Sequence, residues 1–106
     1  MPSHSYALVD VNRQSDNATG TYIKGTAFQI TAAQRSGALL FEASDVSTIV
    51  IGKNFSSAHG FKLKNGTWEA FTASSSTISI GSGNDLVLIG ITSSQTGYTT
   101  YNITIS

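Results

Sequence analysis

The stretch that decides how this chain is expected to fold is GFKLKNGTWEAF, residues 60–71. It places an Asn-Gly pair, residues 65–66, between two runs in which apolar and polar residues alternate. Both central residues of a tight type I′ turn need a positive φ, which asparagine tolerates and glycine adopts freely. A two-residue turn at this point pairs Leu63 with Trp68. The sequence therefore predicts an antiparallel hairpin over residues 60–71.

The two faces of this hairpin differ in polarity, because successive side chains of a strand point in opposite directions. The apolar face carries Phe61, Leu63, Trp68 and Ala70. We expect this face to lie in the core, so that truncating Trp68 to alanine costs about 3–5 kcal/mol of stability. The opposite face carries Lys62, Lys64, Thr67, Glu69 and Phe71. Phe71 is then the exposed apolar side chain of the hairpin and a candidate contact for a partner.

Turn residues divide the rest of the chain into short runs rich in β-branched residues, a pattern typical of all-β domains. The expected strands are residues 6–11, 21–31, 38–42, 46–51, 60–64, 67–72, 77–80, 86–91 and 98–105. Gly25 is expected to mark a bulge in the second strand. Residues 31–35 and 55–59 offer at most one helical turn each. We therefore expect residues 1–106 to form a single all-β domain, an antiparallel β-sandwich or small barrel of about 8–9 short strands.

The charge balance excludes several classes of partner. Six basic and six acidic residues give a net charge of zero, and the chain has no basic run that could bind nucleic acid through its phosphates. No apolar stretch approaches the roughly 18 residues of a membrane-spanning helix. The first residues, MPSHSY, lack the basic and apolar regions of a secretory signal. Cysteine is absent, which excludes disulfides and thiolate sites.

Residues of the types that carry out catalysis in enzymes are few in this chain and scattered along it. The two histidines are His4 and His59, and the chain contains no Gly-x-Ser-x-Gly motif. Asp and Asn gather at residues 10–17 and 84–85, where they favour turns over calcium, which needs six or more oxygen ligands. The glycines at 81 and 83 precede a strand and are expected to form a hairpin turn rather than a phosphate loop. We therefore expect no enzyme activity, no cofactor and no metal site.

Three strands are apolar on both faces. Residues 86–91, LVLIGI, show this most clearly, and residues 38–41 and 49–51 behave similarly. A two-layer sandwich buries only one face of each sheet, so the second faces need a loop, a short helix or another subunit to cover them. Only 11% of the residues are charged, which leaves little repulsion between copies of the chain. We favour another subunit, and we expect a homo-oligomer or a larger protein assembly.

These observations favour a non-enzymatic structural protein that acts through symmetric self-association. A small virion component, such as a phage decoration, head or tail protein, is the setting that we expect. The protein would then lie in the virion, and otherwise in the cytoplasm. The candidate interaction surface consists of Phe71, Tyr98 and Tyr101; the two tyrosines have opposite parities in one strand, so one of them is expected to be exposed. The alternative is a small lectin-like carbohydrate-binding module, which needs an exposed aromatic ring beside Asn or Asp side chains.

Overall fold

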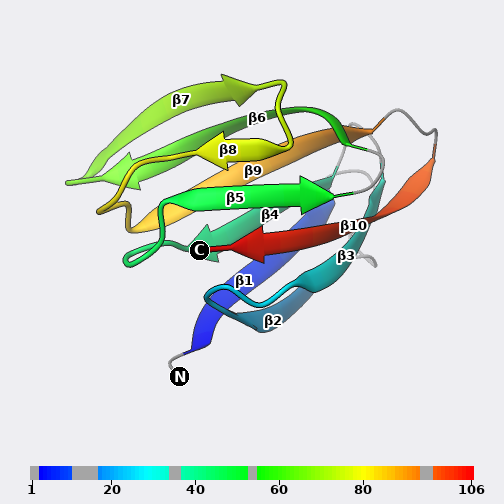
Figure 1. Cartoon of the computed structure of the whole chain (residues 1–106), viewed down its shortest axis with the longest axis horizontal. Coiled ribbons are helices and arrows are strands. Elements are labelled where there is room, and N and C mark those ends of the chain that lie inside the picture. The colour runs from blue at the N-terminus through cyan, green and yellow to red at the C-terminus, as the bar shows by residue number, and fades with distance from the viewer. Residues whose placement is uncertain (1–2, 11–16, 34–36, 53–54, 94–96) are drawn as a thin grey trace.

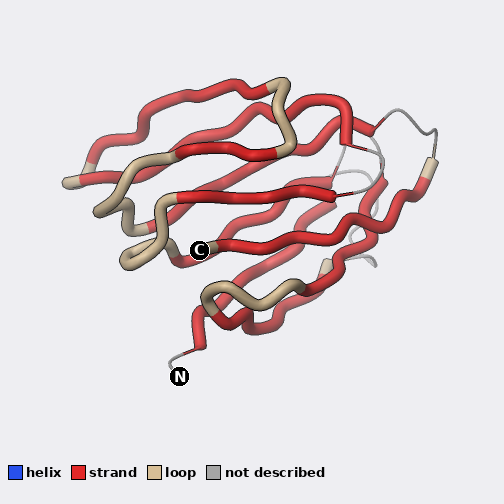
Figure 2. The backbone as a smooth tube through the Cα atoms, in the orientation of Figure 1, coloured by secondary structure: helices blue, strands red, loops and turns tan. Residues whose placement is uncertain are grey.

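The computed structural model describes residues 3–10, 17–33, 37–52, 55–93 and 97–106. Within these ranges the chain forms ten strands and no helix (Figures 1 and 2). The strands are β1 (Ser3–Asp10), β2 (Ala18–Ile23), β3 (Phe28–Ala33), β4 (Gly37–Glu42), β5 (Thr48–Gly52), β6 (Phe55–Lys64), β7 (Thr67–Ala73), β8 (Thr77–Ser79), β9 (Leu86–Ser93) and β10 (Tyr98–Ile105).

The strands belong to two antiparallel sheets. One sheet has six strands in the order β2-β1-β4-β9-β6-β7, and the other has four in the order β3-β10-β5-β8. The two sheets are stacked as layers, with the four-stranded sheet in front in Figure 1. The all-β fold expected from the sequence is confirmed, and of the two expected architectures the structure is the β-sandwich.

The core lies between the two sheets and is built from alternate positions of their strands. In β10, for example, Tyr101, Ile103 and Ile105 are buried, whereas the intervening Asn102 and Thr104 are only partly buried. The largest fully buried side chains are Tyr22, Tyr101, Phe41, Leu39, Ile49, Ile51, Ile80, Ile89, Ile103, Ile105, Val46 and Val87. The expected period-two pattern therefore decides which residues of these strands are inside.

The single strand expected over residues 21–31 is in fact two strands in different sheets. β2 pairs with β1, and β3 pairs with β10. Gly25 has a φ of 81°, and the Thr26 N–H donates to the Ile23 carbonyl at 2.9 Å. The chain therefore turns a corner at Gly25, where a bulge was expected, because a left-handed glycine redirects the backbone away from the first sheet.

Two further expectations about loops are wrong. Residues 55–59 belong to β6 and not to a helical turn, so His59 lies within a strand. Residues 81–85 do not form a hairpin turn, because they connect β8 in one sheet with β9 in the other. Asn84 is buried in this connection, and its Nδ2 donates to the carbonyls of Ile80 and Gly81 at 3.0 Å each. The asparagine side chain thus stabilises this connection by hydrogen bonds to backbone carbonyls, as is usual for this residue in turns.

The register of the hairpin is confirmed. Asn65 and Gly66 have φ values of 53° and 77°, as a two-residue turn requires, and Leu63 pairs with Trp68. The direction of its two faces, however, is opposite to the expected one. Trp68 and Phe61 point outward with 48% of their surface exposed, whereas Phe71 packs against the core.

The inner face of the hairpin also carries a lysine, Lys62, whose ammonium group is hydrogen-bonded. Lys62 shares the inner side with the buried Gly60, and its Nζ donates to the Ile80 carbonyl at 3.1 Å. The same Nζ lies 3.9 Å from Glu69 Oε1. β8 already ends at Ser79, so this end of the hairpin borders a loop, toward which a long lysine side chain can extend. Parity alone shows which residues share a face, but not which face is covered.

Candidate interaction surface

The outer face of the six-stranded sheet carries a row of apolar side chains across five strands. Each residue of the row is the direct cross-strand partner of the next, from β1 through β4, β9 and β6 to β7. The row is Ala7, Leu40, Leu88, Phe61 and Ala70. Directly paired residues lie on the same side of a sheet, so this row is one continuous strip.

The rows on either side extend the strip. On one side the row begins with Glu42 of β4, which pairs with Leu86. Leu86 pairs with Leu63, and Leu63 pairs with Trp68. On the other side Val9 pairs with Ala38 and Ala38 with Gly90. We call the set of apolar residues in these three rows the outer apolar face. It consists of Ala7, Val9, Ala38, Leu40, Phe61, Leu63, Trp68, Ala70, Leu86 and Leu88.

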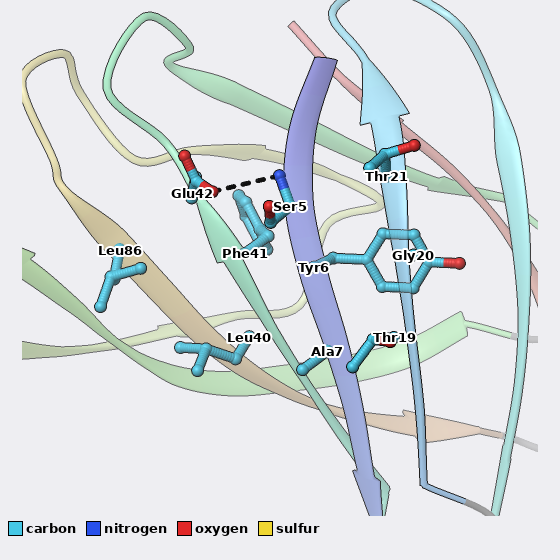
Figure 3. A pocket seen from close by; sticks show the side chains of 10 residues that line it. All are labelled: Ser5, Tyr6, Ala7, Thr19, Gly20, Thr21, Leu40, Phe41, Glu42 and Leu86. Atoms are coloured by element: carbon cyan, nitrogen blue, oxygen red, sulfur yellow. Dashed lines mark hydrogen bonds between the residues drawn. The ribbon is translucent and has the colours of Figure 1, made fainter.

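This face is hollowed in two places. The smaller hollow, of about 310 Å³, lies beside Phe61 and Ala70. The larger hollow has a volume of about 560 Å³ and lies over β1, β2 and β4. Figure 3 shows Leu40, Ala7 and Thr19 side by side on three neighbouring strands, with Leu86 beyond Leu40. At its polar end the Ser5 N–H donates to Glu42 Oε1 at 3.3 Å. We call it the β1–β4 hollow, lined outward by Ser5, Ala7, Thr19, Thr21, Leu40, Glu42 and Leu86.

The outer face of the four-stranded sheet is different in character. Gln29 Nε2 donates to Asn102 Oδ1 at 2.8 Å, and the hydroxyls of Thr31 and Thr100 are 2.9 Å apart. Val50, with 39% of its surface exposed, is an apolar exception near the middle of this face. Hydroxyl and amide groups satisfy their hydrogen bonds with water or with each other, so this face suits solvent. The sandwich therefore has one polar and one apolar outer face.

The structure does not bring the three expected interaction residues together. Tyr101 is only 1% exposed and belongs to the core, so the candidate assignment of Tyr101 to the surface is wrong. Phe71 is partly buried against the core and not an exposed side chain. Tyr98 is 45% exposed, as expected for one of the two tyrosines, but it lies on β10 in the smaller sheet.

The residues that sequence reasoning assigned wrongly are Phe61 and Trp68. Both lie on the outer apolar face, where Phe61 pairs with the outward Leu88 of β9 and Trp68 pairs with Leu63 of β6. The signal that could have found this face is the two-sided apolar pattern of residues 86–91. That pattern did indicate an uncovered second face, and in the described part of the chain no third layer packs over it (Figure 1).

The titratable groups lie apart from the apolar face or at its margin. His4 is buried, stacks on the Tyr22 ring with centroids 5.0 Å apart, and places Nε2 2.9 Å from Asp45 Oδ1. Burial raises the pKa of the Tyr22 phenol, and the charges of Asp45 and Glu42 add to this effect. The Tyr22 hydroxyl donates to the Glu42 carbonyl. Among the described residues, no group of three His, Asp or Glu side chains lies close enough to hold a metal ion.

A smaller hollow of about 370 Å³ lies at the turn end of the hairpin, beside the corner formed by residues 80–84. Its lining is polar and includes Lys64, Asn65, Glu69 and Asn84. The Lys62 ammonium that faces this hollow donates a hydrogen bond to the Ile80 carbonyl. This hollow offers both hydrogen-bond donors and acceptors but little apolar surface.

Comparison of the chain with models of protein families, with curated proteins and with solved structures finds no match. The described residues contain no helix that is long and apolar enough to cross a membrane.

Proposed function

We propose that this is a non-enzymatic assembly protein that associates with further copies of itself through the outer apolar face. The observation that carries the proposal is the apolar row that crosses five registered strands without interruption, at Ala7, Leu40, Leu88, Phe61 and Ala70.

The extent of this face supports an interface. At a strand spacing of about 4.8 Å and about 6.8 Å between like-facing residues, its ten residues cover roughly 330 Å² of flat sheet. Apolar patches of about 300–600 Å² are the largest that monomers usually expose, and they are often functional. The molecule measures 34 × 26 × 24 Å, so a whole face offers on the order of 800 Å², the area that each partner buries in a typical specific interface.

The charge of the chain favours like partners. A net charge of zero produces no long-range repulsion between copies. The carboxylate of Glu42 lies at the margin of the apolar face, where the Ser5 N–H binds it. Association would therefore remove apolar surface from water without burying an unpaired charge at the centre of the face.

The virion setting rests on the composition and stays a prediction of the sequence. The outer apolar face suits any symmetric assembly of copies. A virion component would form its assembly with other copies or with neighbouring shell proteins through the same residues.

Two lysine substitutions test the proposal. Leu88→Lys places a charge at the centre of the outer apolar face, and Val50→Lys places the same charge on the opposite outer face as a matched control. Sedimentation velocity at tens of micromolar should show association for the wild type and for Val50→Lys, and a monomer for Leu88→Lys. A monomeric wild type, or an equal loss of association in both variants, would contradict the proposal.

The exposed rings of Trp68 and Phe61 also favour a second candidate function, a lectin-like carbohydrate-binding module. Aromatic faces stack on sugar rings, but sugar recognition also needs Asn or Asp groups beside them. The cross-strand neighbours of Trp68 and Phe61 are Leu63, Leu88 and Ala70. The indole emission of Trp68 should therefore stay unchanged when monosaccharides and oligosaccharides are added up to millimolar concentrations, and a saturable change would favour the lectin.

A further inference from the structure

The outer apolar face carries both a projection and a recess of its own. The projection is the pair of exposed rings, Trp68 and Phe61, on β7 and β6. The recess is the β1–β4 hollow, on the other side of β9. A surface with a projection and a matching recess on opposite sides of its centre is complementary to a second copy of itself.

We propose that two copies stack face to face about a two-fold axis that runs parallel to the strands along β9, with Trp68 of each copy inserted into the β1–β4 hollow of the other. This inference rests on the proposed function, because it names the partner and the contacts of the same face.

The strand order provides the geometry. β7 lies two strands from β9 on one side, and β1 lies two strands from β9 on the other. A two-fold axis between the copies and along β9 therefore brings β7 of one copy over β1 of the other. Two sheets stacked in this way keep their strands within about 30° of each other, which is the common packing of twisted sheets.

The central row then matches residue by residue. Because the axis runs along the strands, each row of one copy faces the same row of the other. Leu88 faces its own counterpart, Phe61 faces Leu40, and Ala70 faces Ala7. Apolar groups thus meet apolar groups along the whole central row.

Trp68 belongs to the row of Leu86 and Glu42, so it faces the polar end of the β1–β4 hollow. The hollow of about 560 Å³ is open enough to admit an indole ring. Its apolar wall is formed by Ala7, Leu40 and Leu86, and its polar end offers oxygen acceptors on Ser5 and Glu42. An indole carries one N–H donor on an apolar body, so both parts of Trp68 find suitable surroundings there.

The experiment is a complementation between two variants. Trp68→Ala removes the projection and leaves the hollow intact, and Ala7→Phe fills the hollow and leaves the projection intact. Each variant alone should associate at least about 100-fold more weakly than the wild type, because two ring contacts are lost per dimer. An equimolar mixture should recover association to within about tenfold of the wild type. In the mixed dimer one ring enters an intact hollow, and the introduced phenylalanine meets the gap left by the missing indole.

The chain has a single tryptophan, so the mixture also has a direct optical readout. Only the Ala7→Phe copy has tryptophan emission, and this emission should shift to shorter wavelength when Trp68→Ala protein is added. Circular dichroism checks that both variants fold, and Thr19→Phe, also in the hollow, is a second filling variant if Ala7→Phe does not. Val50→Lys protein should associate as the wild type does.

The outcomes separate this inference from the proposed function. Recovery in the mixture with a blue shift supports the inserted-ring arrangement. A wild type that associates, together with variants that do not complement or that associate normally alone, overturns this arrangement but keeps the proposed function. A wild type that is monomeric overturns both.

Discussion

Truncation of the two aromatic residues of β7 distinguishes the inner face of the hairpin from its outer face. Phe71 packs against the core, and its ring lies so close to Gly60 that a Cβ added there would come within 2.6 Å of Phe71 Cζ. Phe71→Ala therefore leaves a cavity beneath β7, at the low end of the about 3–5 kcal/mol found for buried phenylalanine. Trp68 keeps 48% of its surface in water and leaves no enclosed cavity when truncated. Its loss to alanine should cost the free protomer no more than about 2 kcal/mol.

Urea unfolding followed by circular dichroism measures both changes, since Trp68→Ala removes the only tryptophan and with it the fluorescence signal. The titrations should be run at low micromolar concentration or below, because association would add its own free energy to the apparent stability. With a slope of about 1–2 kcal/mol per molar urea, the two variants should differ in midpoint by roughly 0.5–1 M. A larger loss for Trp68→Ala than for Phe71→Ala would show that our assignment of the two faces is wrong.

Three further changes test the local structure. Gly60→Ala should destabilise the protein by about 2–4 kcal/mol in thermal or urea unfolding, because the new Cβ would lie 2.4 Å from the Leu88 carbonyl oxygen. The control is Gly52→Ala, whose Cβ makes only ordinary contacts and which should cost about 1 kcal/mol or less. Gly66→Ala should cost about 1 kcal/mol by the same measurement, since Gly66 has a φ of 77° in the hairpin turn; an unchanged midpoint would contradict the turn geometry. Burial raises the pKa of Tyr22, so its contribution to stability is complete below the ordinary tyrosine pKa of about 10 and is lost as the pH rises further. Unfolding midpoints at pH 8, 10 and 11 should therefore fall more steeply for the wild type than for Tyr22→Phe, and parallel curves would argue against the buried phenol.

Much of the strand pattern could be predicted because it depends on local chemistry. The Asn-Gly turn at 65–66 fixes the register of the hairpin without help from the rest of the fold. The boundary between β2 and β3 could not be predicted in this way, because Gly25 permits a bulge as readily as a corner. Which of these occurs depends on β10, whose Ile105 carbonyl accepts a hydrogen bond from the Gly25 N–H. That contact joins residues 80 positions apart, and no local pattern contains it.

The candidate surface was predicted in outline and misplaced in detail. The apolar pattern of residues 86–91 on both parities indicated an uncovered face, and that face exists on β9. Trp68 was assigned to the core because large aromatic residues are usually buried. Its orientation is instead set by the four-stranded sheet, which packs on the side of Gly60 and Ala58. The local sequence thus determines which residues share a face of the sheet. Whether that face points to the core or to solvent depends on the layer that packs against the sheet.

The difference between the two outer faces has a consequence for the growth of any assembly. When two copies join through their outer apolar faces, both outward surfaces of the pair are the hydroxyl- and amide-bearing sides of the smaller sheets, with Gln29, Thr31, Thr100 and Asn102. A third copy then finds no second apolar face on which to stack. Growth by face stacking is therefore self-limiting, and the mass of the assembly should reach a plateau at two copies as the concentration rises.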